Sequence, residues 1–292
     1  MGAIAHRHEH VAALRLGLEL GMTVVDTAEN YGGAEEMVGE AIAGRRAEVF
    51  LVSKVYPRDL GELGQSIKSL IPPALRPLVP HSLKALASSI LGKSSAELRG
   101  RTRQEMVAAC ERSLRRLRTD RLDLYLLHWR GAVPLDETLA AFLDLAQAGK
   151  IRYFGVSNFD MHDLEEWRAL GGADTTVTNQ VRYNLNHRGI EENVLPWCRR
   201  HGLTIMAYSP HDQGRLLANR TLQQIGGRLG VSPTQVALAW LVRHDGIIAI
   251  PKATRLEHVR ENRAALAVEL TSADLIDLER AFPAPRRKQL PE

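Results

Sequence analysis

The spacing of hydrophobic positions along this chain switches repeatedly between the period of a helix and that of a short buried strand. Residues 7–20 carry apolar side chains at Val11, Leu14 and Leu18 with charged residues between them, which predicts an amphipathic helix. A β-branched run at 23–26 predicts a strand. The alternation continues to the end of the chain, with strands predicted at 48–54, 122–127, 153–156, 175–179, 203–207 and 247–250, and helices at 35–43, 102–117, 134–148, 160–169, 190–200, 217–229, 232–243, 255–265 and 273–281.

Short apolar strands that alternate with helices predict a parallel sheet covered by helices. Right-handed crossovers leave two main closures, an open doubly wound sheet and a (β/α)8 barrel. No GxGxxG motif follows any of the predicted strands, which removes the main support for a Rossmann site. Chain length, strand number and even composition therefore favour an α/β protein with a (β/α)8 TIM barrel, formed by residues 1–292 as a single domain.

The regular pattern breaks between residues 57 and 101, where the chain carries five prolines. Two short amphipathic pieces, at 61–71 and 81–92, contain enough apolar residues to argue against a plain disordered linker. We interpret 57–101 as an insertion that serves as a lid or an interface. A packing appendage without a ligand role is the alternative.

Composition places the chain among ordinary globular proteins, with 45% hydrophobic and 25% charged residues. No apolar run approaches the ~18 residues of a membrane span, and the first residues carry no secretory or myristoylation signal, so a cytoplasmic protein is expected. The net charge of +4 comes from scattered arginines, which does not indicate nucleic-acid binding. Cys110 and Cys198 are expected to be reduced thiols, and the alternate histidines at positions 6, 8 and 10 lack the fixed scaffold of a metal site.

Each predicted strand ends in a polar or ionisable residue. In a parallel barrel the carboxyl ends of all strands lie on one face, where active sites of this architecture are built. A barrel that binds no ligand needs only loop-forming residues such as Gly, Asn and Pro at these positions. The observed pattern therefore favours a functional site on that face. The residues concerned are Asp26, Lys54, His128, Ser157, Asn158, Gln180, Tyr208 and Lys252.

An Asp, a Lys, a His and a Tyr around one barrel mouth form a set suited to proton transfer. Tyr31 follows Asp26 by five residues, and by themselves these two could be a helix cap and a core aromatic. A free Tyr has a pKa of about 10, but a neighbouring Lys ammonium stabilises phenolate and an Asp can hold that Lys charged. With Lys54 and His128 on the same face, Tyr31 becomes a candidate general acid.

Seven stretches of the chain resemble the aldo-keto reductase family. They occur in the family's order and span residues from about 11 to 283. The resemblance identifies the chain as a member of that family, which implies a (β/α)8 barrel. The stretches are GMTVVDTA at 21–28 with Tyr31, LVSK at 51–54, DLYLLH at 123–128, GVSNF at 155–159, NQV at 179–181, AYSP at 207–210, and IPK at 250–252 with Glu261 and Asn262.

The resemblance implies a catalytic tetrad of Asp26, Tyr31, Lys54 and His128, and a nicotinamide cofactor, NADPH in most members with NADH as the alternative. The residues that it assigns to the cofactor are Ser157, Asn158 and Gln180 at the carboxamide, Tyr208 on the nicotinamide ring, Ser209, Pro210, Gly214 and Leu216 along the pyrophosphate, and Lys252, Thr254, Glu261 and Asn262 around the adenosine phosphate. Trp129 is a candidate wall of the substrate pocket, with a core aromatic as the alternative.

The chain departs from the family pattern in three places. The family's opening strand, with its Gly-rich segment, is expected before the first helix, yet only about ten residues stand there, so the first barrel strand is predicted to be missing. His258 occupies the position where the family often places an Arg for the 2′-phosphate, which weakens the preference for NADP over NAD. The insertion at 57–101 follows the strand that ends in Lys54, so it is expected on the active-site face, over the substrate mouth.

These observations predict an oxidoreductase that transfers hydride from NADPH to an aldehyde or ketone, with Tyr31 as the general acid. The alternative is a nucleotide-binding but catalytically weak regulatory or assembly protein on the same fold, with 57–101 as its partner surface. A truncated chain that cannot fold stably is a third reading. The sequence fixes neither the carbonyl substrate nor the oligomeric state, because the loops that shape a pocket are not determined by these motifs.

Overall fold

Strands and helices alternate along residues 6–57, 101–131 and 134–285, which the computed structural model describes. The segment 58–100, and with it the predicted lid or interface, lies outside the described residues. The strands are β1 (Val24–Asp26), β2 (Phe50–Val55), β3 (Leu122–Leu127), β4 (Ile151–Ser157), β5 (Thr176–Arg182), β6 (Thr204–Tyr208) and β7 (Ile247–Ala249). The helices are α2 (Arg7–Glu19), α3 (Ala34–Ala41), α7 (Arg103–Leu117), α8 (Leu135–Gln147), α9 (Met161–Ala169), α10 (Val194–Arg200), α11 (Arg220–Leu229), α12 (Pro233–Val242), α13 (Leu256–Ala264) and α14 (Ser272–Ala281).

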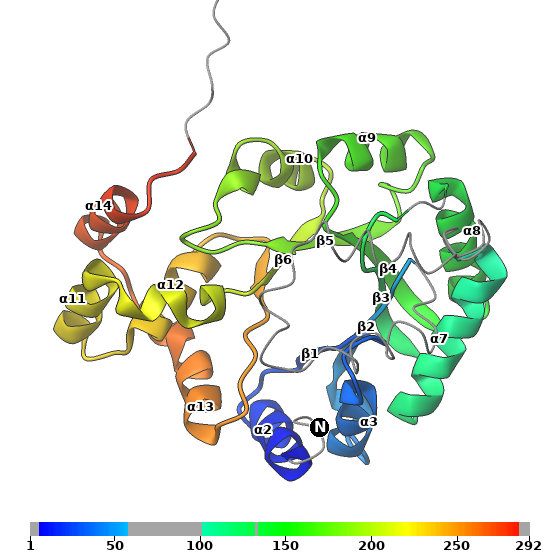
Figure 1. Cartoon of the computed structure of the whole chain (residues 1–292), viewed down its shortest axis with the longest axis horizontal. Helices are drawn as coiled ribbons and strands as arrows, with labels where there is room; N and C mark the ends of the chain where they lie inside the picture. The colour runs from blue at the N-terminus through cyan, green and yellow to red at the C-terminus, as the bar shows by residue number, and fades with distance from the viewer. Residues whose placement is uncertain (1–5, 58–100, 132–133, 286–292) are drawn as a thin grey trace, which may run out of the picture.

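The strands form one curled parallel sheet whose spatial order is the order of the sequence, from β1 to β7. Helices surround this sheet on its outside, as in a (β/α)8 barrel (Figure 1). In the described part of the chain, β1 and β7 are the two ends of the sheet. There the ring is continued by helices, since α13 packs against α2 and Arg263 Nε donates to the Leu20 carbonyl oxygen at 2.9 Å. The predicted parallel α/β architecture is confirmed.

Local sequence signals start the helices at the positions where the structure has them. Thr102, Asp160, Ser232 and Thr271 each cap a helix with a reciprocal capping box, in which a side chain three residues later bonds back to the cap N–H. Pro233 follows the Ser232 cap in the first turn of α12, where its missing N–H costs nothing. These four helices therefore begin by rules that act within four residues.

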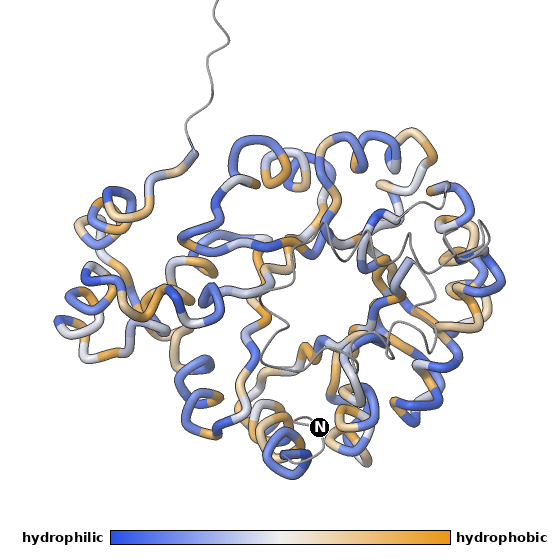
Figure 2. The backbone as a smooth tube through the Cα atoms, in the orientation of Figure 1, coloured by the Kyte–Doolittle hydropathy of each residue, from blue (hydrophilic) through white to orange (hydrophobic). Residues whose placement is uncertain are grey.

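Strand side chains point alternately to two different cores. On β2, Leu51 and Val55 join the large core between the sheet and the helices, whereas Val52 faces the barrel interior. Interior partners of Val52 are Leu124, Leu126 and Met206. The helices are hydrophobic on the side that faces the strands and hydrophilic outside (Figure 2). Both faces of β2 and β3 are thus covered, which explains their nearly continuous apolar sequences.

Gly155 in β4 lies where both neighbouring strands come close to its backbone. A Cβ atom at this position would lie 2.8 Å from the Thr178 carbonyl oxygen and 2.8 Å from a Leu126 methyl carbon. The pairing of β4 with β5 also shifts register between Phe154 and Val156. A residue without a side chain is therefore needed where β4 bends, just before the polar positions at its carboxyl end.

The structure moves the start of one predicted helix. The helix predicted at 217–229 begins only at Arg220, because the Asn219 side chain caps it and the preceding Asp212–Ala218 forms 3-10 turns.

Cys110 and Cys198 are free and buried, as expected, and burial raises the pKa of each thiol to about 12. Within the described ranges, no helix has the length and apolarity required to cross a membrane.

Candidate active site

The alternation of side chains along the strands brings the predicted site residues to the barrel interior. Lys54 lies two residues after Val52, so it points inward like Val52, while Ser53 points outward and donates to Glu35 on α3 at 2.6 Å. The same parity applies to Asp26 on β1 and to Gln180 on β5. The strand register then places their ends at one face, because Asp26 pairs with Val52 and Ser157 pairs with Gln180.

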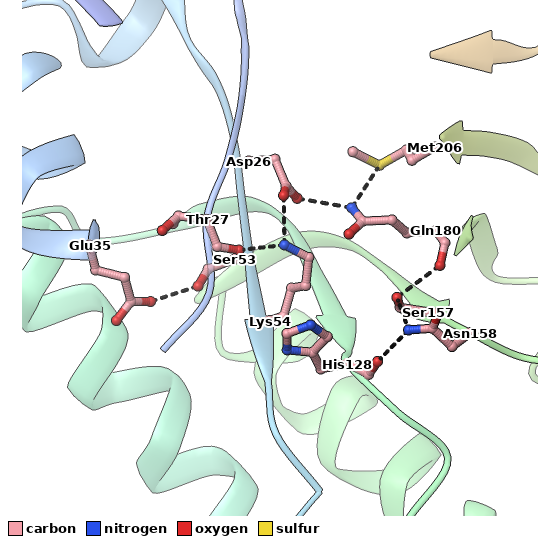
Figure 3. A network of polar contacts seen from close by, with 10 residues as sticks. All are labelled: Asp26, Thr27, Glu35, Ser53, Lys54, His128, Ser157, Asn158, Gln180 and Met206. Atoms are coloured by element: carbon pink, nitrogen blue, oxygen red, sulfur yellow. Dashed lines mark hydrogen bonds and ion pairs between the residues drawn. The ribbon is translucent and has the colours of Figure 1, made fainter. Parts of the chain in front are cut away.

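Lys54 is the centre of the polar network in the barrel mouth (Figure 3). Its fully buried ammonium donates to Asp26 Oδ2 at 2.6 Å and to the Thr27 carbonyl oxygen at 2.8 Å. Gln180 Nε2 donates to the other carboxylate oxygen of Asp26 at 2.9 Å, from the opposite side of the barrel. Two of the predicted tetrad members therefore form a buried ion pair that a cofactor-site residue also fixes.

Tyr31 lies on the loop between β1 and α3, with its ring beside the Lys54 ammonium. Lys54 Nζ is 4.9 Å from the centre of the phenol ring, and the ring meets His128 edge-on at 5.6 Å between centroids. The Tyr31 side chain is 45% exposed, so it can be reached from outside. The structure thus brings together all four residues of the predicted tetrad, one from each of β1, β2, the segment after β3 and the loop after β1.

His128 follows β3 and is largely buried between the aromatic residues of the mouth. Burial, with the nearby Lys54 charge adding to it, lowers the pKa of His128 to about 4. Its Nδ1 atom is buried and finds no hydrogen-bond partner among the described residues. His128 is therefore neutral at physiological pH, so it can donate one hydrogen bond without bringing a second positive charge beside Lys54.

The predicted carboxamide-binding residues form a connected chain of hydrogen bonds. Ser157 Oγ donates to the Gln180 carbonyl oxygen at 2.8 Å, and Asn158 Nδ2 donates to the His128 carbonyl oxygen at 3.1 Å. Tyr208 donates its hydroxyl to Asn158 Oδ1 at 2.9 Å, and burial raises the pKa of this phenol, which keeps it protonated. Asn158 adopts a left-handed backbone with φ of 60°, a conformation that Asn tolerates better than most residues. These hydrogen bonds hold the predicted carboxamide-binding residues next to the predicted tetrad.

The loop after β6 carries the residues expected along the pyrophosphate. Ser209 begins the loop with φ of 51°, Pro210 and Leu216 are buried, and Gly214 takes φ of 88°. Asp212 anchors the loop, because its buried carboxylate accepts Arg182 Nη2 at 2.5 Å and Asn186 Nδ2 at 3.0 Å. The sequence reading missed Asp212 and Arg182, which carry no local motif.

Four predicted residues, Lys252, Thr254, Glu261 and Asn262, gather after β7 and on α13, and we call them the adenosine end. Lys252 is exposed and has no ion pair within the described part of the chain. Both ring nitrogens of nearby His211 are buried, and neither has a well-formed hydrogen bond to a described residue. Burial lowers the pKa of His211. A hydrogen bond with the Asn262 side chain acts in the opposite direction, and the charge of His258 lowers the pKa further. The exposed Lys252 ammonium at this end suits a phosphate-bearing nucleotide, so the residues present fit the predicted cofactor.

The structure adds three residues to the site that the sequence reading did not identify. Tyr56 places its ring edge-on to His128, with 5.8 Å between the ring centroids. Its position two residues after Lys54, just beyond the end of β2, was an available signal. Glu29 and Arg101 form a buried ion pair beside Tyr56, and no motif in their local sequences predicts this pair.

Trp129 stacks beside His128 with 6.3 Å between ring centroids, and its side chain is 45% exposed. This exposure removes the interpretation of Trp129 as a core aromatic. Together with Tyr31 and Tyr56, it borders His128 with aromatic rings at the barrel mouth.

Comparison with known proteins points to one family over nearly the whole length of the chain. A model of the Aldo/keto reductase family matches residues 5–281. The methylglyoxal reductase YeaE of Escherichia coli K12 is 45% identical over 291 residues, which is 97% of this chain and 88% of that protein. The glyoxal reductase of Bacillus subtilis is 31% identical over 276 residues, with 93% of this chain and 83% of that protein covered.

A solved structure shows the same fold with a cofactor in place. It is an aldo/keto reductase from Klebsiella pneumoniae in complex with NADP and acetate, which is 44% identical in sequence and superposes with a TM-score of 0.79. The match covers 97% of this chain and 88% of that one. With a barrel mouth that holds Asp26, Tyr31, Lys54 and His128 together, the chain belongs to the aldo/keto reductase family.

Proposed function

We propose that this protein is an NADPH-dependent reductase of small aldehydes and ketones, with Tyr31 as the general acid. The observation that carries the proposal is the position of the Tyr31 ring between the Lys54 ammonium and the neutral His128 imidazole. This is an acid beside the two groups that can stabilise its conjugate base and orient a carbonyl oxygen.

The cofactor is proposed to lie along Ser157, Asn158, Gln180 and Tyr208, with its phosphates toward the loop after β6 and the adenosine end. NADPH, when bound, supplies the hydride that the carbonyl carbon accepts. The Klebsiella pneumoniae relative, whose structure holds NADP, supports this choice of nucleotide.

In the proposed reaction the residues of this chain manage one proton. The Tyr31 hydroxyl donates its proton to the carbonyl oxygen as that oxygen gains negative charge, and the product is an alcohol. The Lys54 ammonium stabilises the resulting phenolate, while Asp26 and the Thr27 carbonyl oxygen hold the ammonium in place. Neutral His128 donates a hydrogen bond to the carbonyl oxygen, and solvent returns a proton to Tyr31 afterwards.

The substrate class is proposed from two supports. The exposed rings of Tyr31 and Trp129, with Tyr56 and His128 behind them, form an uncharged aromatic rim. Relatives at 45% and 31% identity are methylglyoxal and glyoxal reductases. We therefore propose small 2-oxoaldehydes as substrates.

The proposal is tested with Tyr31→Phe, which removes the acid and keeps the ring. We expect kcat for methylglyoxal to fall by roughly 10² to 10⁴, measured by the loss of NADPH absorbance. The affinity for NADPH, followed by protein fluorescence, should stay close to that of the original protein. Equal turnover by both proteins would refute the role of Tyr31.

Separate fluorescence titrations with NADPH and NADH test the cofactor part of the proposal. Tighter binding of NADPH is expected, because the adenosine end offers the cation Lys252 to a 2′-phosphate. Tight nucleotide binding without turnover across a panel of aldehydes and ketones would instead favour a regulatory protein.

A further inference from the structure

Glu29, on the loop that carries Tyr31, has a buried carboxylate with no part in the proposed proton transfer. Its Oε1 atom accepts the backbone N–H of Tyr56 at 2.8 Å and Arg101 Nη1 at 2.6 Å. The Glu29 and Arg101 side chains are only 9% and 5% exposed. A buried charged pair is costly to desolvate, so its presence beside an active site calls for a reason other than stability alone.

The Glu29 carboxylate continues the hydrogen-bond ladder between β1 and β2 beyond the strand ends. Thr27 N–H donates to the Val52 carbonyl oxygen at 3.0 Å, and Glu29 N–H donates to the Lys54 carbonyl oxygen at 3.4 Å. In a regular parallel ladder the next N–H on β2, that of Tyr56, would bind the backbone carbonyl of Glu29. Here the side-chain carboxylate takes that place. The chain of β1 is thereby free to turn away while it stays attached to β2.

That turn presents Tyr31 to the barrel mouth. Tyr31 N–H donates to the Ala28 carbonyl oxygen at 3.1 Å, which closes a tight turn around Glu29. On the other strand, Tyr56 contacts His128 with its ring edge, and His128 N–H donates to the Val55 carbonyl oxygen at 2.9 Å. One carboxylate therefore joins the segment that holds the proposed acid to the segment that borders His128.

Arg101 fixes the carboxylate from a distant part of the chain. Its backbone N–H donates to the Pro57 carbonyl oxygen at 2.9 Å. Pro57 in turn packs on Gly131, where φ is 63° and a Cβ atom would come within 2.4 Å of the Pro57 side chain. Only glycine fits at this position, just after His128 and Trp129. The Glu29–Arg101 pair is thus attached to the end of β2 and, through Pro57, to the segment after His128.

We propose that Glu29, held by Arg101, is a positioning residue that fixes the Tyr31 loop to the end of β2, so that the phenol stays beside Lys54 and His128. It acts through backbone contacts and touches neither substrate nor cofactor. The inference rests on the proposed carbonyl reduction for its kinetic consequence, but its structural consequence does not depend on that reaction.

Glu29→Gln is the first test, because the amide keeps the size and the acceptor oxygen but removes the negative charge that pairs with Arg101. We expect kcat for methylglyoxal to fall by roughly 10- to 100-fold, as for other small misplacements of a catalytic group. The dissociation constant of NADPH should change little, since the cofactor-binding residues lie on other strands. A purely structural role would instead lower the melting temperature and leave kcat per folded molecule intact.

Arg103→Gln is the matched control. Arg103 lies two residues after Arg101, and its ion pair with Asp144 is exposed on both sides. Exposed pairs of this kind contribute little, so unchanged kcat and NADPH affinity are expected. Glu29→Asp, which keeps the charge on a shorter side chain, should give a kcat between those of the original protein and Glu29→Gln. It also replaces Glu29→Gln should the latter not fold.

Hydrogen exchange measured by mass spectrometry provides a readout without turnover. Peptides that contain Tyr31 and Tyr56 should exchange roughly 10-fold faster in Glu29→Gln, with β5 and β6 unchanged. If the original protein reduces no carbonyl, the proposed function fails and this exchange result alone decides the role of Glu29. Unchanged exchange in these peptides, or an unchanged kcat in the folded variant of an active enzyme, would overturn the proposal.

Discussion

At the catalytic corner, which comprises Asp26, Tyr31, Lys54 and His128, the charged groups are already paired with one another inside the barrel. At the adenosine end, Lys252 faces solvent without an ion pair among the described residues. The Lys54–Asp26 pair of the first region lies inside the protein, whereas the Lys252 ammonium of the second lies at the surface. Under the proposed function, this pairing would preorganise the corner for chemistry, whereas the adenosine end would keep its binding groups available for a ligand.

Replacing Lys54 and Lys252 in turn is the most direct test of this difference between the two regions. In Lys54→Met the buried Asp26 carboxylate would keep Gln180 but lose its cation. We expect the free energy of unfolding to fall by about 3 kcal/mol, since an uncompensated buried charge remains, and reductase activity to disappear. Urea denaturation gives the stability, with NADPH consumption as the activity assay.

Lys252→Met serves as the stability control for that variant, because its ammonium is exposed. A change within about 0.5 kcal/mol is expected, as for most surface substitutions. Equal destabilisation of the two variants would contradict the view that only the catalytic corner belongs to the core.

The pH dependence of stability tests the burial of His128. Its pKa of about 4 lies below the ordinary value of 6.5, so between these values the unfolded chain binds more protons than the folded one. Stability from neutral His128 is therefore complete above about pH 6.5 and is lost as the pH falls toward 4, by up to about 1.4 kcal/mol per pH unit. Urea denaturation across this range should show a shallower loss for His128→Asn, and identical slopes would speak against a buried, neutral imidazole.

The smallest expected effect concerns cofactor affinity at the adenosine end. If Lys252 binds the phosphate there, Lys252→Met should weaken NADPH roughly 10-fold through the loss of one charge-assisted contact. NADH, which lacks the 2′-phosphate, should be affected less. Fluorescence titration with both nucleotides measures the difference, and an equal loss for both would place Lys252 away from the 2′-phosphate.

Much of the fold could be predicted from the sequence because its signals are local. The capping boxes at Thr102, Asp160, Ser232 and Thr271 act within four residues, and each one starts a helix in the structure. Boundaries were less predictable where tertiary contacts compete. The segment before Arg220 has helical apolar spacing, but the buried Asp212 carboxylate, bonded to Arg182, holds it in 3-10 turns instead.

The sequence by itself determined the order of strands and the residue at each strand end, since hydrophobic periodicity and parallel pairing follow from chain geometry. It could therefore place Asp26, Lys54 and Gln180 on one rim. Only the tertiary structure decided that Gln180 donates to Asp26, or that Glu29 is bound by Arg101. Such contacts join residues far apart in the chain, and their partners are selected by distance and burial, which no local pattern encodes.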